Sequence, residues 1–237
     1  MIFLRNAKAL IFADSHLGFE EDMSSKGIFI PRAQLSKLLT MLEEALNNVM
    51  PEVLIIAGDV KHIFNRLGRI ERLELEQLFA FIKKHDISRT ILVRGNHDNF
   101  LKLIVKKYNI EVVDQLLIED VLIVHGHKEI EYNSKEFKIV IMGHEHPSIV
   151  LRNSIGPLVK IPCFLLIPTI HGISLVVLPA SGIYQSGTAV TLARESYLSP
   201  IIRNSAILEE AKPIALIEKE GPIELPSLKL ITDLIIT

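Results

Sequence analysis

Short apolar runs alternate with amphipathic stretches through the first half of the chain. Strands of a buried parallel sheet read as continuous apolar runs, whereas helices show apolar residues three and four positions apart. Runs of the first kind predict strands at residues 8–13, 53–57 and 90–93. Stretches of the second kind predict helices at residues 32–49, 71–85 and 99–108. This alternation predicts parallel strands joined by crossover helices, and ligands of such sheets collect at the carboxyl ends of the strands.

The second half of the chain shows strand-like runs and almost no helical spacing. Its expected strands cover residues 110–113, 116–124, 138–142, 149–152, 159–167 and 174–178. These strands predict a second sheet packed on the first. Residues 180–200 are rich in Gly, Ser and Thr and are expected to form a long surface connection. We expect one domain over residues 1–237, with residues 200–237 as an extension of it. The tail after Pro213 is expected to complete a sheet, cover an edge or serve a homodimer contact.

Composition narrows the class of protein. The chain has 26 basic and 28 acidic residues. This near-neutral balance argues against a protein that binds long nucleic acid mainly through phosphate contacts, but it is compatible with a local basic groove. Cys163 is the single cysteine, which fits a reducing compartment, and no signal peptide is visible, so a cytoplasmic protein is expected. The most membrane-like stretch, residues 161–178, contains Pro162, Pro168 and Gly172 and is interpreted as two buried strands with a turn.

Five short polar blocks follow apolar runs, so each is expected where a buried strand ends. They are Asp14-Ser15-His16, Gly58-Asp59, Gly95-Asn96-His97-Asp98, His125-Gly126-His127 and Gly143-His144-Glu145-His146. Carboxylate oxygen, amide oxygen and imidazole nitrogen are the donors that divalent metals take in mixed sites. Together the blocks point to metal-assisted hydrolysis of a phosphate ester.

Taken alone, the blocks differ in force. Gly58-Asp59 is typical of a turn with a helix-capping Asp, and His125 also fits a core histidine with a satisfied ring. Asp98 could orient a ring or cap the helix expected near Asn99. The Gly-Asn-His-Asp and Gly-His-Glu-His blocks favour function even in isolation, and the five blocks jointly far exceed chance.

The order Asp-x-His, Gly-Asp, Gly-Asn-His-Asp, His and Gly-His-x-His resembles the calcineurin-like metallophosphoesterase superfamily over residues 14–146. The segments Asp14-Ser15-His16-Leu17-Gly18-Phe19-Glu20 and Gly143-His144-Glu145-His146-Pro147 are similar to archaeal phosphoesterases related to the Mre11 and SbcD nucleases, described as ICC-like. Bacterial ligase-associated phosphodiesterases are similar too. The resemblance implies an α/β fold, a four-layer αββα sandwich of two mixed β-sheets flanked by helices.

The resemblance also implies roles by position. Asp14, His16, Asp59 and His146 would bind one metal; Asp59, Asn96, His125 and His144 would bind the other, with Asp59 bridging. Two metals roughly 3.5–4 Å apart can bridge a water, lower its pKa and clamp the phosphoryl oxygens. His97 would then stabilise or protonate the leaving oxygen. Manganese is the expected ion, and Fe, Zn and Ni suit the same donors.

The resemblance has one departure. Many members carry Asp or Asn three residues after the bridging Asp, where this chain has His62. We expect His62, Asp98 and His127 to contact substrate or to support the ligands. The expected activity is a phosphodiesterase, on a nucleotide, a nucleic acid or another diester. A phosphomonoesterase and a non-catalytic scaffold of the same fold are the alternatives, and the scaffold is disfavoured because Asn96 and His97 are both present.

Overall fold

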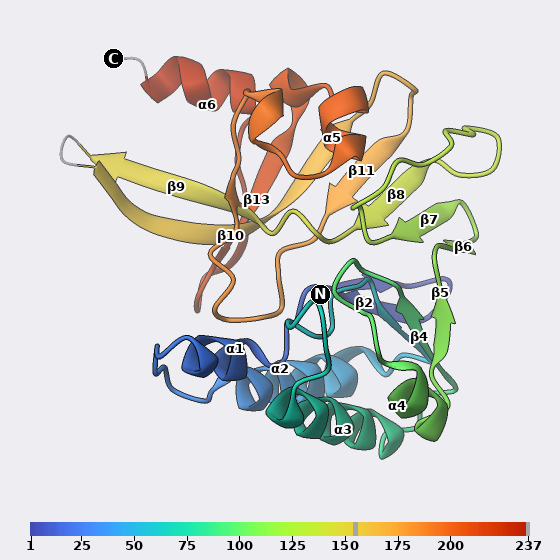
Figure 1. Cartoon of the computed structure of the whole chain (residues 1–237). Helices are drawn as coiled ribbons and strands as arrows, with labels where there is room; N and C mark the ends of the chain where they lie inside the picture. The colour runs from blue at the N-terminus through green and yellow to red at the C-terminus, as the bar shows by residue number, and fades with distance from the viewer. Residues whose placement is uncertain (154–155, 236–237) are drawn as a thin grey trace. The chain divides into compact units, whose positions relative to one another are not determined.

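The computed structural model describes residues 1–153 and 156–235. The chain divides into two compact units (Figure 1). Unit 1 comprises Met1–Leu116 and Ser181–Tyr184, and unit 2 comprises Leu117–Ala180 and Gln185–Thr237. Each unit contains a mixed sheet with its own helices.

The sheet of unit 1 has five strands in the order β1-β2-β3-β4-β5. Its strands are β1 (Ile2–Leu4), β2 (Ala9–Phe12), β3 (Val53–Ile56), β4 (Arg89–Val93) and β5 (Glu111–Val113). Strand β1 runs antiparallel to its neighbour, whereas β2, β3, β4 and β5 pair in parallel. The three strands predicted to carry the ligand blocks are therefore adjacent, with their carboxyl ends at one edge.

Four helices accompany this sheet: α1 (Phe19–Ser25), α2 (Gln34–Val49), α3 (Arg69–Lys83) and α4 (Lys102–Lys107) (Figure 1). Leu38 and Leu42 of α2 and Leu75 of α3 are fully buried and pack in one cluster with Phe12 and Ile56 of the strands. The predicted apolar stripes thus face the sheet, as amphipathic helices require.

The prediction for α4 was wrong at its start. Residues 99–101 are not helical, and Phe100 adopts a φ of 67° that breaks the expected helix. Helix α4 begins at Lys102 with no side-chain cap, so Asp98 does not cap it. Helix α3 begins two residues earlier than expected, and Glu71 in its first turn accepts from the Gly68 N–H at 3.0 Å.

The sheet of unit 2 is also mixed and has nine strands in the described part of the chain. Its main path is β12-β9-β10-β11-β8-β7-β6, with β13 paired to β10 and β14 paired to β13. The strands are β6 (Leu116–Ile118), β7 (Val121–Val124), β8 (Ile139–Met142), β9 (Pro147–Asn153), β10 (Gly156–Pro168), β11 (Ser174–Val177), β12 (Thr188–Ala189), β13 (Lys212–Ile217) and β14 (Gly221–Glu224). The expected strand at 116–124 is split in two at Glu119, whose φ is 52°. The predicted class, an α/β fold with two mixed sheets flanked by helices, is confirmed.

Two helices of unit 2 lie in a segment where no helical spacing was recognised. They are α5 (Pro200–Ser205) and α6 (Leu228–Ile235). Ile201 and Ile202 of α5 and Leu228 of α6 pack in one cluster with Leu165 and Val177 of the sheet. The connection at 180–200 is only partly superficial, because Tyr197 and Ser199 are buried. The tail does complete a sheet, through β13 on β10.

The stretch at 161–178 forms the antiparallel pair β10 and β11, as predicted. Among residues 1–153 and 156–235, no helix combines the length and apolar character that a membrane crossing needs.

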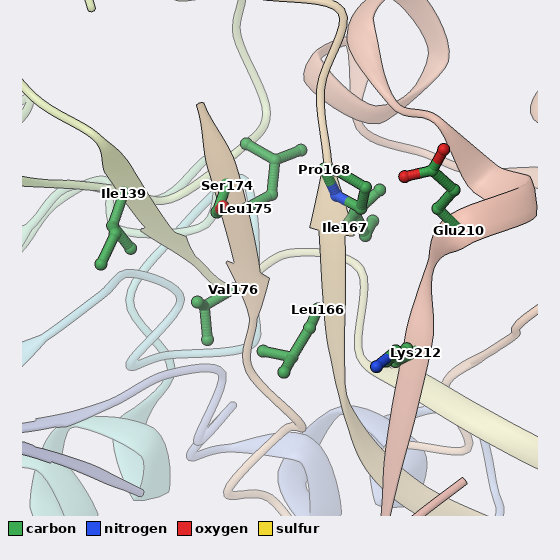
Figure 2. Close-up of a pocket in the computed structure, with 9 residues that line it drawn as sticks. All are labelled: Ile139, Leu166, Ile167, Pro168, Ser174, Leu175, Val176, Glu210 and Lys212. Atoms are coloured by element: carbon green, nitrogen blue, oxygen red, sulfur yellow. The ribbon is translucent and has the colours of Figure 1, made fainter. Parts of the chain in front are cut away.

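The sheet of unit 2 carries a surface pocket. Its volume is about 450 Å³, and it lies over β8, β10, β11 and β13 (Figure 2). Ile139, Leu166 and Val176 give it an apolar floor, and Glu210 and Lys212 stand at one side.

The α2 contact with its sheet gives a first prediction. Leu42→Ala removes a side chain with 0% exposure from the cluster of unit 1, so the free energy of unfolding should fall by about 2–5 kcal/mol. Urea denaturation followed by circular dichroism measures this change. Leu73→Ala on α3, where the side chain is 52% exposed, is the matched control and should shift stability by no more than about 0.5 kcal/mol. Equal effects of the two substitutions would contradict the packing described.

Candidate metal centre

Three of the polar blocks lie at one edge of the unit 1 sheet. Asp14, Asp59 and Asn96 follow β2, β3 and β4. Near the ends of these strands Phe12 pairs with Ile56, and Ile56 pairs with Leu92. The loops after β2 and β3 continue to pair beyond the sheet. Asp14 N–H donates to Gly58 O at 3.0 Å and His16 N–H to Asp59 O at 3.0 Å. The sequence prediction that these blocks share one edge is confirmed.

The ligand loops have unusual backbone conformations. Asp14, His16 and Asp59 have φ values of 57°, 43° and 51°, in the left-handed region that residues with a Cβ rarely adopt. Such conformations persist only where the surroundings enforce them, and they cluster at functional sites. Gly95 is required for a different reason: a Cβ there would lie 2.1 Å from Asp59 Oδ1. The loops of β3 and β4 therefore touch with no room for a side chain.

Buried carboxylates hold these loops in place. Asp98 accepts backbone N–H bonds from Asp59 at 2.8 Å, Val60 at 2.9 Å and Gly95 at 2.8 Å. It thereby ties the loop after β4 to the loop after β3. A carboxylate that accepts several N–H groups makes charge-assisted hydrogen bonds, which are about twice as strong as neutral ones. Asp98 is thus a support of the loops and not a helix cap.

Helix α3 supplies two further carboxylates to the same loops. Glu71 accepts from His62 N–H at 2.9 Å and Ile63 N–H at 2.7 Å, and Glu74 accepts from Gly18 N–H at 2.8 Å. Sequence reasoning missed both residues. A signal existed, because Glu71 and Glu74 lie on the same helix face as the buried Leu75 and Leu78, where a charge needs an internal partner.

Three imidazoles gather above these supports. One ring nitrogen each of His16, His62 and His97 lies within 4.8 Å of the others, a spacing that could hold a metal ion. His16 Nε2 lies 3.8 Å and His97 Nε2 4.0 Å from Asp59 Oδ2. The rings of His62 and His97 stack at 5.7 Å with an interplanar angle of 19°. The structure therefore places His62 in one cluster with His16 and His97. The sequence alone did not decide between a contact to metal, to substrate or to His97.

His62 has a carboxylate partner that the sequence did not reveal. Its Nε2 lies 3.4 Å from Asp22 Oδ2 on α1, and its Nδ1 lies 3.4 Å from His16 Nδ1. Burial lowers the pKa of the His62 imidazole, and the Asp22 carboxylate opposes that shift. His62 is thus anchored between α1 and the His16 ring.

Unit 2 repeats the arrangement of loops at strand ends. Its parallel strands β7 and β8 end in register at Val124 and Met142, and the histidine blocks follow. The rings of His125 and His144 lie 5.0 Å apart, and His127 lies 5.3 Å from His125. His144 and His146 also have positive φ values, of 70° and 47°. The two histidine blocks of unit 2 therefore converge as the sequence predicts.

Glu145 ties the loop after β8 to residues 198 and 199. It is buried, and its carboxylate accepts from Leu198 N–H at 2.9 Å and Ser199 N–H at 2.9 Å. Ser199 Oγ donates in turn to Gly126 O at 2.7 Å. His146 O accepts from Thr188 N–H at 3.0 Å. The segment expected to be a surface connection therefore fixes both histidine loops of unit 2.

The donor chemistry of each unit suits a divalent metal. Unit 1 offers the Asp14 and Asp59 carboxylates, the Asn96 amide and a cluster of imidazoles, and unit 2 offers His125, His127, His144 and His146. Mixed carboxylate and imidazole sets accept Mn, Fe, Zn or Ni. Cys163 takes no part, because it is fully buried and burial raises the pKa of its thiol to about 12.

A family profile and several solved structures are similar to this chain. The sequence profile of calcineurin-like phosphoesterases matches residues 7–148, more than half of the chain. Among solved structures, nuclease MPE from Pseudomonas putida aligns with a TM-score of 0.63 and 24% identity over 94% of this chain and 90% of that chain. YfcE, a phosphoesterase from E. coli, aligns with a TM-score of 0.46 and 14% identity over 92% and 98% of the two chains. No curated protein matches the chain.

The chain therefore belongs to the calcineurin-like phosphoesterase family, a family of metal-dependent hydrolases. The likeness to nuclease MPE supports the fold and nothing finer. The metal-binding character expected from the sequence is in accord with the family and with the histidine cluster of unit 1.

The role of Asp98 gives a second prediction. In Asp98→Asn, one carboxylate oxygen becomes an NH₂ group that faces an N–H donor, so the free energy of unfolding should fall by about 1.5–3 kcal/mol. Urea denaturation measures the loss, and Asp114→Asn, at a carboxylate whose side chain is 76% exposed, is the control. A stability equal to that of the control variant would show that the three hydrogen bonds do not hold the loops.

Glu74 gives a pH-dependent prediction. Burial raises its pKa to about 7 in the folded protein, above its ordinary value of 4.5. The folded state then binds the proton more tightly, so the free energy of unfolding should fall as pH rises from about 4.5 to 7. Glu74→Gln keeps an oxygen for the Gly18 N–H and removes the charge. Denaturation curves at pH 5 to 8 should show the variant gaining stability over the parent with rising pH; parallel curves would refute this.

Proposed function

We propose that this protein is a two-metal phosphodiesterase. Asp14, His16, Asp59 and His146 would hold one divalent ion, and Asp59, Asn96, His125 and His144 the other. The observation that carries the proposal is the placement of every donor type at the end of a parallel strand, with loops fixed by buried carboxylates. Family membership supports a metal-dependent hydrolase, and the resemblance of the motif order implies this ligand set. Manganese is the proposed ion, by the resemblance to the nuclease-related phosphoesterases.

Bound metals would supply an activated water and neutralise charge on the phosphoryl oxygens. The protein's own contribution centres on His97. Its backbone N–H donates to Asp59 Oδ1 at 2.9 Å, and its Nδ1 hydrogen-bonds to His62 O. A carbonyl partner keeps the proton on Nδ1, so Nε2 gains a proton only in the imidazolium form. His97 would then donate that Nε2 proton to the leaving alkoxide.

The substrate class follows from the resemblance. We propose a phosphodiester, as in nucleotides or nucleic acid, and a subgroup close to the archaeal nuclease-related phosphoesterases. A homodimer through the C-terminal segment is part of the same proposal. The phosphomonoesterase alternative makes the opposite prediction about substrate preference, and the scaffold alternative predicts no turnover.

Hydrolysis assays test the proposal directly. The purified chain loaded with Mn²⁺ should hydrolyse bis-p-nitrophenyl phosphate faster than p-nitrophenyl phosphate, and chelation should abolish both reactions. Asp59→Asn should lower kcat at least about 100-fold, because a bridging carboxylate is lost. His97→Ala should retain bound metal while kcat falls about 100- to 10,000-fold, the range for a lost general acid.

Each outcome separates one alternative. Faster cleavage of the monoester would favour the phosphomonoesterase. Full activity of Asp59→Asn would remove the bridged mechanism, and full activity of His97→Ala would remove its role as acid. If no ester is hydrolysed with Mn, Fe, Zn or Ni, and plasma emission spectrometry finds little bound metal, the non-catalytic scaffold would be the remaining alternative. Glu52→Gln, at an exposed surface ion pair with Lys8, controls for loss of a carboxylate elsewhere.

A further inference from the structure

Five aromatic and imidazole rings of unit 1 form a continuous row, which we call the ring row. Tyr184 stacks on Phe19 at 5.6 Å and 15°, and Phe19 meets His62 edge to face at 4.9 Å. His62 stacks on His97 at 5.7 Å, and His97 meets Phe64 at 5.5 Å and 88°. The two histidines that belong to the candidate metal centre thus have an aromatic ring on each side.

The outer ring at one end is open to solvent. Phe64 is 56% exposed although it contacts the His97 ring. At the other end, Tyr184 is half-buried and its hydroxyl donates to Pro31 O at 2.5 Å, which fixes the ring over Phe19. Isolated exposed apolar residues are ordinary on protein surfaces. In the ring row, each ring is held in place by its neighbours while Phe64 stays exposed to solvent. A subsite that stacks on a base requires this combination.

The loop that carries Phe64 is basic in sequence, and the Glu21 carboxylate of α1 accepts from its Arg69 N–H at 3.0 Å. Residues 60–70 contain Lys61, Arg66 and Arg69 and no acidic residue. Lys61 is buried and donates to the Ile63 and Arg66 carbonyls, so it organises the loop. Arg66 and Arg69 are exposed. A phosphate chain next to Phe64 would therefore meet positive charge, which favours nucleic acid over a neutral aromatic ligand.

We propose that the ring row binds the unpaired bases on the two sides of the cleaved phosphate. Phe64 would stack on one base and the Phe19–Tyr184 pair on the other, with the phosphate at His62 and His97. The substrate is then a single-stranded nucleic acid or an unpaired end, because a base inside a duplex has no free face to offer. The inference rests on the proposed phosphodiesterase function and names its substrate class.

Substrates with and without bases test this inference. Steady-state cleavage by the Mn²⁺-loaded full chain is compared for a fluorescein-labelled oligothymidylate and for the same sugar–phosphate chain made of abasic residues. The parent protein should show a KM about 5- to 100-fold lower for the oligothymidylate, the range expected for stacking of one base. Phe64→Ala should remove most of this difference, and Phe64→Tyr should retain it.

The control is Leu103→Ala, which removes an exposed apolar side chain from α4 and should change nothing. Tyr184→Ala should reduce the same KM difference from the other end of the row. Equal KM values for both chains in the parent protein, unchanged selectivity in Phe64→Ala, or a preference for duplex over single strand would each overturn the proposal.

Failure of this inference can be told from failure of the proposed function. If bis-p-nitrophenyl phosphate is hydrolysed but bases make no difference, only the ring row loses its assignment. If no ester is hydrolysed, the phosphodiesterase proposal falls. In that case equilibrium binding of the two labelled oligonucleotides, measured by fluorescence anisotropy, still tests stacking. Tighter binding of the oligothymidylate that Phe64→Ala abolishes would support the ring row, and equal binding would refute it.

Discussion

Backbone N–H groups bound by buried carboxylates are the interaction on which the candidate site depends. Asp98, Glu71 and Glu74 accept such bonds in unit 1, and Glu145 does so in unit 2. Loops that turn sharply at strand ends leave N–H groups without partners inside the protein, and each would be costly if unsatisfied. A carboxylate accepts several at once and fixes one loop against the next. The candidate metal-binding side chains are therefore carried by a backbone that several hydrogen bonds hold in place.

These hydrogen bonds to buried carboxylates also explain how short loops are sufficient to place the candidate donors of each unit. In unit 1 the parallel register of β2, β3 and β4 places the three polar blocks side by side, and helix α3 fastens them through its acidic residues. In unit 2 the register of β7 and β8 does the same, and residues 198–199 take the place of the helix. Only the few residues of the polar blocks offer metal donors, whereas their placement requires complete strands and, in unit 1, helix α3.

The sequence was sufficient for β2, β3, β4 and β8 and for the polar blocks that follow them, because buried parallel strands are unbroken apolar runs. It was insufficient for the short strands β1, β12 and β14. It was also insufficient for α1, α5 and α6, each too short to show several helical turns of periodicity. Helix α4 starts later than expected because the backbone of Phe100 is in the left-handed region, and no sequence pattern around Phe100 predicts this conformation. The buried carboxylates were missed because hydrogen bonds such as Glu145 to Leu198 join residues 53 positions apart.

The left-handed conformations at Asp14, His16, Asp59, His144 and His146 bear on how this fold can diverge. A residue with a Cβ is strained there, and glycine is not. Replacement of such a residue by glycine would relieve local strain while it removes a candidate metal donor, so selection for stability alone does not protect the candidate site. A descendant chain could keep the fold and lose the ability to bind metal. Natural selection could still retain it because its surface binds another molecule. Only selection for turnover opposes that drift.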